Sequence, residues 1–285
     1  MRCNKLKPSI SVRNIALCPF VANAGFSNID FGFASFEKRN EILMENYTDT
    51  TLKNYEFIKQ NGLTISQVHL TLYPGHFKPL GNGTYEAFAE QMLPIFIKEL
   101  EITAKMNCQH AVIHLYFEKD VNNSRKGNIT LISKLMPYLE KHNITLCIEN
   151  IYGPNYSPVH LSTSEELLFY TNYFNSNNVG ICLDTGHAII SGQDPIALAD
   201  TLGIKIKALH VHTTYGGFDR HLLPFSQGNK IDWYKFYNVL LSNGYSGTLN
   251  FETHCPKDIN DKQKEEFYKI AYQQYLKIKN QTIDR

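Results

Sequence analysis

The sequence predicts one α/β domain, a single (β/α)8 TIM barrel that takes in residues 1–285, and three observations favour this fold. Short β-like runs alternate eight times with longer amphipathic stretches, and no linker or low-complexity segment divides the chain. The length of 285 residues suits a fold that needs about 250. The alternative, a doubly wound open sheet, usually carries a glycine-rich dinucleotide loop after an early strand, and the sequence has none there.

Each predicted strand is a short apolar run, and each predicted helix has apolar residues at helical spacing or a recognisable end signal. Gly25 and Gly62 are expected to end two early helices, Pro94 to kink the helix that contains it, and Asp232 to cap a late one. The predicted strands are 9–12, 29–33, 64–72, 110–117, 144–149, 179–184, 206–211 and 247–252. The predicted helices are 15–24, 40–60, 85–105, one that includes 129–139, 164–175, 195–202, one that starts after Asp232, and 262–279.

Composition narrows the class of protein. The chain is 43% hydrophobic and 19% charged with a formal net charge of +1, so it has no overall field that would attract nucleic acid or an anionic membrane. Its apolar runs are shorter than the roughly 20 residues of a transmembrane helix, and its first residues lack the apolar core of a signal peptide. Six cysteines without CxxC spacing favour reduced thiols. We expect a cytoplasmic protein without membrane contact. The sequence leaves open whether the protein forms a homo-oligomer.

Charged and imidazole side chains stand where the predicted strands end. The apolar part of each of two segments, ITLCIEN (144–150) and GICLDTGH (180–187), ends on a carboxylate, Glu149 in the first and Asp184 in the second. Carboxylates at buried strand ends are costly unless a cation compensates them, and the active site of such a barrel lies at these ends. Ligands of this type suit Mn, Mg, Co, Fe or Zn. The full set of strand-end candidates is His69, His114, Glu149, Asp184, His210 and Glu252.

Several candidates have an equally simple structural interpretation. His69 and His114 could be hydrogen-bonded histidines of the core or rim, and His187 could cap the loop after the sixth strand. Asp219 and His221 could belong to a solvated loop. His212 falls on the same strand face as His210 but beyond the strand end, so it is left out of the predicted site, as are His254 and Cys255.

Six short motifs, in this order and spacing, resemble the xylose isomerase-like superfamily of TIM barrels. That superfamily includes sugar and sugar-phosphate isomerases and epimerases and the endonuclease IV type of apurinic endonuclease. The resemblance runs from about the second predicted strand to the eighth and is strongest after Ile144. The motifs are CIEN (147–150), GICLDTGH (180–187), HVH (210–212), DRH (219–221), GNKIDW (228–233) and GYSGTLNFE (244–252).

The isomerase and epimerase branch implies an enzyme of carbohydrate metabolism that acts on a small sugar or sugar phosphate. The resemblance implies one divalent metal ion (Mn, Mg, Co or Zn) held by Glu149, Asp184, His210 and Glu252. It also implies that Glu149 and Glu252 act as acid and base, moving a proton through a metal-stabilised enediolate. His187 matches a substrate-binding position of that branch.

The endonuclease branch is the alternative, and it implies up to three Zn ions and nucleic acid as the partner. The additional ligands that it implies match His69, His114, His187, Asp219 and His221. Three departures weigh against it: the first strand (SISVRN) lacks the expected signature, His69 is followed by Leu-Thr-Leu-Tyr-Pro, and Gly186 stands where Cys or Ser is usual. A second alternative, from another class, is a barrel that binds a sugar without catalysis.

Basic and aromatic residues in the predicted loops could meet a sugar phosphate or wall a pocket, and they could equally be ordinary loop residues. The basic residues are Arg125, Lys126, Arg220 and Lys230, and the aromatic ones are Tyr73, Phe77, Tyr116, Tyr152 and Tyr215.

Overall fold

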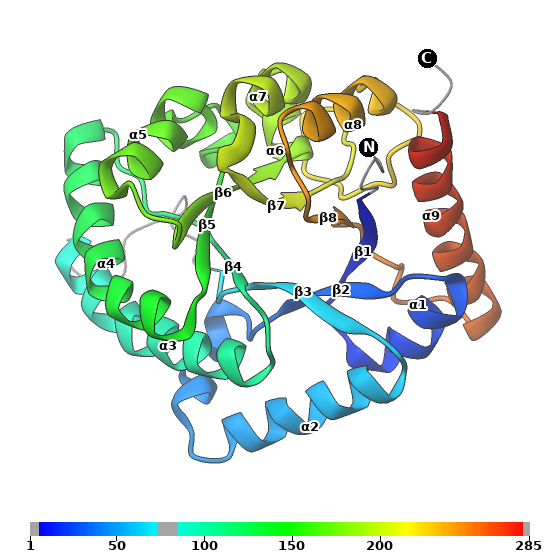
Figure 1. The fold of residues 1–285 in the computed structure, drawn as a ribbon, viewed down its shortest axis with the longest axis horizontal. Helices are drawn as coiled ribbons and strands as arrows, with labels where there is room; N and C mark the ends of the chain where they lie inside the picture. The colour runs from blue at the N-terminus through cyan, green and yellow to red at the C-terminus, as the bar shows by residue number, and fades with distance from the viewer. Residues whose placement is uncertain (1–5, 73–84, 282–285) are drawn as a thin grey trace.

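Eight parallel strands form a barrel in this computed structural model, which describes residues 6–72 and 85–281 (Figure 1). The strands follow the order β7-β6-β5-β4-β3-β2-β1-β8, and a parallel bridge between Val211 and Phe251 joins the two ends of this series. The predicted (β/α)8 barrel is confirmed. The strands are β1 (Lys7–Val12), β2 (Asn28–Gly32), β3 (Thr64–His69), β4 (His110–Ile113), β5 (Thr145–Glu149), β6 (Val179–Asp184), β7 (Ile206–His210) and β8 (Thr248–Phe251).

Helices surround the barrel and cover its outer face (Figure 1). Within the part of the chain that the structure describes, no helix combines the length and apolar character needed to cross a membrane. The α-helices are α1 (Cys18–Ala24), α2 (Tyr47–Gln60), α3 (Tyr85–Lys105), α4 (Val121–His142), α5 (Ser164–Phe174), α6 (Thr185–Ile190), α7 (Pro195–Leu202), α8 (Trp233–Ser242) and α9 (Asp261–Gln281). Short 3₁₀ segments are η1 (Ile15–Leu17), η2 (Phe36–Leu43), η3 (Pro154–Tyr156), η4 (His160–Ser162) and η5 (Gly203–Lys205).

The predicted end signals account for several helix boundaries. Gly25 ends α1 at φ 112°, a left-handed conformation that glycine adopts without strain, and its N–H donates to Ala22. The Asp232 carboxylate accepts hydrogen bonds from the N–H groups of Tyr234 and Lys235 and so starts α8. Pro94 lies inside α3, where a kink stays a prediction.

Several segments differ from the sequence prediction. The strand predicted over 64–72 ends at His69, and the helix predicted over 15–24 divides into η1 and α1. The strand predicted over 110–117 ends at Ile113, and the helix predicted over 40–60 divides into η2 and α2. A short helix, α6, follows β6 directly, where the sequence analysis placed a loop.

Small buried side chains fill the barrel interior beneath the C-terminal ends of four strands. Val112, Cys147, Cys182 and Ala208 form this cluster, which is separate from the larger core between strands and helices. The prediction that Cys147 and Cys182 are small core residues is confirmed. The space above this cluster is where the polar side chains of the strand ends converge.

Candidate active site

The predicted strand-end residues lie at one end of the barrel, and most are nearly inaccessible to solvent. Asp184 and His210 are paired in the register of β6 and β7, while His114 and Glu252 directly follow the last residues of β4 and β8. Of the six predicted strand-end residues, all except His114 are at most 6% exposed. His69, Glu149, Asp184 and His210 are the final residues of β3, β5, β6 and β7.

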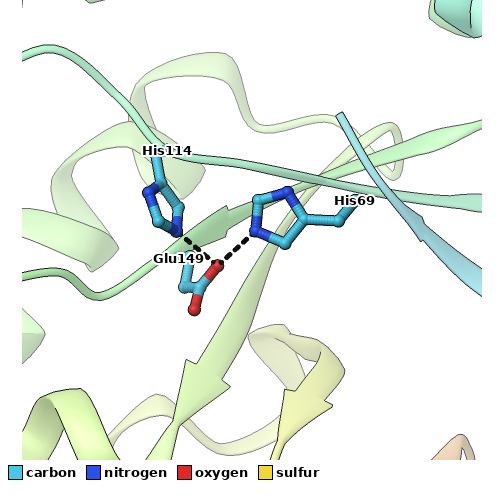
Figure 2. Close-up of side chains that lie close together, drawn as sticks. All are labelled: His69, His114 and Glu149. Atoms are coloured by element: carbon cyan, nitrogen blue, oxygen red, sulfur yellow. Dashed lines mark hydrogen bonds and ion pairs between the residues drawn. The ribbon is translucent and has the colours of Figure 1, made fainter. Parts of the chain in front are cut away.

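Glu149 is the centre of the arrangement because both of its carboxylate oxygens have histidine partners. Its Oε2 lies 3.2 Å from Nε2 of His69 and 2.9 Å from Nε2 of His114. Figure 2 shows these two imidazoles pointing at the same oxygen. Its Oε1 lies 2.9 Å from Nδ1 of His210 and 3.4 Å from Nδ1 of His187. The Glu149 carboxylate belongs to three groups of ligand atoms: one with His69 and His114, one with Cys182 and His210, and one with Asp184, His210 and Glu252.

The largest of these groups contains Glu149, Asp184, His210 and Glu252, whose donor atoms all lie within 4.8 Å of one another. Three carboxylates gathered out of water favour a compensating cation, and three oxygens with one imidazole fit a divalent metal ion. The neighbouring Cys182 is a poorer ligand because burial raises the pKa of its thiol well above the usual value, and the thiolate is the form that binds metal.

A further group lies toward the rim and contains His212, Asp219 and His221, again with donor atoms within 4.8 Å. Oδ2 of Asp219 lies 3.1 Å from Nε2 of His221 and 3.3 Å from Nε2 of His187. His212 stacks on His221 at 4.5 Å between ring centroids, and its Nε2 lies 3.1 Å from Oδ2 of Asp184. The structure thus brings the predicted His187, Asp219 and His221 together and adds His212, which the sequence analysis left out.

Histidine neighbours keep a carboxylate of each group ionised. Burial alone would raise the pKa of Asp219, but hydrogen bonds from His187 and His221 hold it well below its usual range. Burial would likewise raise the pKa of Glu252, and the charges of His210 and His221 lower it. Ionised carboxylates are the form that can ligate a metal ion.

Two residues that the sequence analysis missed support this ring from the N-terminal strands. Asp30 on β2 is fully buried; its Oδ2 accepts a hydrogen bond of 2.7 Å from the Ser11 hydroxyl and lies 3.3 Å from Nε2 of His210. One guanidinium nitrogen of Arg13 lies 3.0 Å from Oε1 of Glu252 and 3.5 Å from Oδ2 of Asp30. A charged residue inside the otherwise apolar run of β2 was the available signal for Asp30.

One of the predicted aromatic residues reaches the site. The Tyr152 hydroxyl lies 3.3 Å from Oδ2 of Asp219, and its ring lies 5.0 Å from that of His187. Tyr215 is 41% exposed and packs under Arg220. Tyr73 and Phe77 lie outside the described residues.

Two curated proteins are similar in sequence to part of this chain. The uncharacterized protein MJ1311 of Methanocaldococcus jannaschii is 30% identical over 159 residues, which are 55% of this chain and 51% of that protein. The chain spans about half the length of the curated relatives it matches.

Solved structures are similar over nearly the whole chain. A D-tagatose 3-epimerase-like protein has a TM-score of 0.72 at 19% identity and covers 98% of this chain and 100% of its own. A D-psicose 3-epimerase solved with D-fructose has a TM-score of 0.70 at 15% identity and covers 93% and 96%. The family model described as xylose isomerase-like TIM barrel matches residues 20–271, a range that contains β2 to β8 and every strand-end donor described above. This chain belongs to the xylose isomerase-like TIM barrel family.

Proposed function

We propose that the protein is a divalent-metal-dependent isomerase or epimerase of a small sugar or sugar phosphate. The observation that carries this proposal is the buried set of Glu149, Asp184, His210 and Glu252 at the C-terminal strand ends. These four residues would hold the cation, which when bound supplies electrostatic stabilisation for negative charge that develops on substrate oxygens. The names of two structural neighbours, an epimerase-like protein and a D-psicose 3-epimerase, support the substrate class.

Glu149 and Glu252 are the proposed proton-transfer pair. Their oxygens lie 2.9 and 3.3 Å from the same atom, Nδ1 of His210, so the two carboxylates flank one small space. One carboxylate takes the proton from a carbon next to the sugar carbonyl. The other must carry a proton when the substrate binds, and in an epimerisation it returns that proton to the opposite face of the same carbon. In an isomerisation the proton goes to the neighbouring carbon, and the hydroxyl proton moves to the former carbonyl oxygen. The reaction needs no other reactant, because every proton removed is replaced.

Exchange of either glutamate for glutamine tests these roles. We expect Glu149→Gln and Glu252→Gln each to lower kcat by about 10² to 10⁴-fold, because general acid and base catalysis contributes that much. The measurement is turnover of a panel of ketoses and their phosphates, with deuterium uptake from D2O at the carbon that changes configuration.

Glu140→Gln, on the exposed face of α4, is the matched control, and it should keep full activity. Circular dichroism should report an intact fold in all three variants. Near-normal turnover in either strand-end variant would exclude the two-glutamate mechanism.

A zinc-dependent apurinic endonuclease is the second candidate, and one observation favours it. The donor groups continue on both sides of the central set, with His69 and His114 on one side and His212, Asp219 and His221 on the other. This function predicts close to three zinc ions per chain and cleavage of DNA that contains an abasic site. About one ion per chain and no DNA cleavage would favour the isomerase. Sugar binding without turnover or cleavage would instead indicate a non-catalytic barrel.

A further inference from the structure

The Asp30 carboxylate lies inside the barrel, one layer below the donors at the strand ends. In the register of β2 and β3, Gly32 is level with His69, and Asp30 is level with Gln67, two residues earlier. Asp30 is fully buried, and a buried carboxylate is costly unless other groups compensate its charge. Packing alone would favour an apolar residue at this position.

A chain of hydrogen bonds from the two strands beyond β2 fixes the Asp30 carboxylate. The Ser9 hydroxyl on β1 donates to Oδ1 of Asn250 on β8 at 2.8 Å. The Asn250 amide donates to the Ser11 hydroxyl oxygen at 3.3 Å, and the Ser11 hydroxyl donates to Oδ2 of Asp30 at 2.7 Å. Each donor in this chain points toward Asp30, so the carboxylate is held in place as an acceptor.

His210 lies between Asp30 and the proposed proton-transfer pair. Its Nε2 lies 3.3 Å from Oδ2 of Asp30. Its Nδ1 lies 2.9 Å from Oε1 of Glu149 and 3.3 Å from Oε2 of Glu252. The two ring nitrogens thus face different acids, and Nδ1 is the nitrogen on the side of the proposed cation.

His210 and Asp30 each have an unused hydrogen-bonding atom beside the other. Among the described residues, neither Nε2 of His210 nor Oδ1 of Asp30 has a hydrogen-bond partner. Buried polar groups are usually hydrogen-bonded, and a neutral imidazole has one N–H and one lone pair. If the proton is on Nε2, beside Asp30, the lone pair of Nδ1 faces the cation.

The neighbouring arginine does not account for Asp30. The Arg13 guanidinium forms a hydrogen bond of 3.0 Å to Oε1 of Glu252, whereas its distance to Oδ2 of Asp30 is 3.5 Å. The arginine offsets part of the charge of both carboxylates, but the shorter contacts of Asp30 are with Ser11 and His210.

We propose that Asp30 is a positioning residue for His210: its carboxylate accepts the Nε2–H of the ring, so that Nδ1 is the nitrogen that binds the cation. This inference rests on the proposed metal-dependent function. Asp30 itself touches neither the substrate nor the ion. A carboxylate that accepts the second ring N–H of a histidine ligand fixes the orientation of the ring and makes the ligand more basic.

Metal affinity tests this role. We expect Asp30→Ala to raise the Kd for Mn²⁺ by about 10- to 100-fold, the usual effect of removing the partner that orients a histidine ligand. Asp30→Asn keeps one acceptor oxygen without the negative charge, so its Kd should lie between the values of Asp30→Ala and wild type. Isothermal titration calorimetry with Mn²⁺ measures all three proteins, and circular dichroism checks their fold.

The two variants separate hydrogen bonding from charge. Both substitutions remove the same negative charge near the cation, and only Asp30→Asn can still accept the Nε2–H. Equal Kd values for the two folded variants would mean that charge alone acts, and this result would overturn the positioning role. A wild-type Kd in Asp30→Ala would overturn it as well.

NMR gives a second measurement that needs only the milder variant, in case Asp30→Ala does not fold. In histidine-labelled protein saturated with Mg²⁺, the wild-type His210 ring should carry its proton on Nε2, and His210→Gln identifies the signal by its absence. This proton should exchange with water about 10-fold faster in Asp30→Asn, because a hydrogen bond to a charged acceptor is weakened. A proton on Nδ1, or an unchanged exchange rate, would overturn the proposal.

Glu166→Gln is the matched control. Like Asp30, Glu166 is buried, and it pairs with a partly exposed arginine, Arg125, at 2.7 Å. It lies on α5, outside the barrel strands, so its exchange should lower stability and leave the Kd for Mn²⁺ unchanged. An equal rise of the Kd in Glu166→Gln would show that the loss of any buried charge disturbs the site, and would overturn the specific role of Asp30.

The titration needs no sugar, so the two proposals fail separately. Mn²⁺ binding that depends on Asp30 supports the positioning role even if no sugar or sugar phosphate is turned over, a result that would contradict the isomerase proposal. Turnover together with equal Mn²⁺ affinity in wild type and Asp30→Ala would support the isomerase and overturn the role of Asp30.

Discussion

Gly186 leaves the space that the His212 imidazole occupies. A Cβ atom at Gly186 would overlap the His212 ring, which packs against the first turn of α6. His212 is fully buried and holds Oδ2 of Asp184 at 3.1 Å. Gly186 is one of the departures from the apurinic endonuclease pattern. Because it has no side chain, it leaves room for an additional histidine, His212, beside Asp184. The HVH motif (210–212) indicated a second histidine on the same strand face. The sequence could not show that the residues after β7 stay buried at the C-terminal end of the barrel.

Adding one methyl group at this position should be costly. We expect Gly186→Ala to lower the free energy of unfolding by about 1 to 3 kcal/mol, because overpacking of a full core forces neighbours to shift. Chemical denaturation measures the effect. In the double variant Gly186→Ala/His212→Ala the ring is gone, so the loss should be smaller than the sum of the two single losses. Strict additivity would show that the two residues do not compete for space.

At the scale of elements, apolar runs located the strands, but a run can continue after a strand has ended. The run from His110 to Phe117 stays buried beyond Ile113, with Tyr116 only 2% exposed. There the Asn128 side chain forms the hydrogen bonds to the backbone of Tyr116 that a neighbouring strand would form. It accepts one from the Tyr116 N–H at 3.2 Å and donates one to the Tyr116 carbonyl at 2.8 Å. The local sequence pattern cannot show that a side chain, and not a neighbouring strand, forms these hydrogen bonds.

Helix α6 was missed because a strand and a helix meet at one residue. Asp184 ends β6 and also caps α6, since its Oδ1 accepts a hydrogen bond of 2.6 Å from the N–H of His187. The usual loop, with its polar and glycine-rich composition, is absent from this junction within the described chain. The helix turns His187 toward Asp219 and Glu149, so the short element serves the site directly.

Glu99 links α3 to the segment after β3 through a carboxyl group that is fully buried. It accepts hydrogen bonds from the Thr71 N–H at 3.0 and 3.1 Å and from the Thr71 hydroxyl at 2.6 Å. Burial nevertheless raises the pKa of Glu99 to about 8 from a usual 4.5, although the Thr71 hydrogen bonds lower it. The folded protein therefore keeps a proton that the unfolded chain releases between these two pH values.

This difference predicts a loss of stability as pH rises. From about pH 5 to about pH 8 the free energy of unfolding should fall by up to about 1.4 kcal/mol per pH unit through this one group, and the contribution is fully present below pH 4.5. Glu99→Gln cannot release the proton, so it should gain stability relative to wild type over the same range. Denaturant titrations at several pH values measure the gap between the two proteins. A constant gap would contradict the buried, protonated carboxyl.

At the scale of the whole molecule, the eightfold alternation predicted the barrel, and the barrel then gathered strand ends that are far apart in the chain. This is why Glu149, Asp184, His210 and Glu252 could be assigned to one site from sequence. The remaining parts of the site depend on contacts between residues far apart in the chain, such as Arg13 after β1 and Glu252 after β8, which are 239 positions apart in sequence and follow neighbouring strands. No local pattern carries such a pairing, since a lone arginine after a strand looks like any solvated charge.

The whole barrel should be more stable with its cation than without it, because the ion would offset repulsion among three buried carboxylates. Chelator-treated protein should melt several degrees lower than the same protein in Mn²⁺, and a free metal concentration of 100 Kd should add about 2.7 kcal/mol. Asp184→Asn keeps the side-chain oxygen that caps α6 and removes one ligand charge. This variant should still fold and melt cooperatively, but its melting temperature should rise much less on addition of Mn²⁺. Asp258→Asn, on the exposed loop before α9, should keep the full shift. Equal melting of wild type in chelator and in Mn²⁺ would mean that the histidines alone balance the carboxylates, and the metal site would then be excluded.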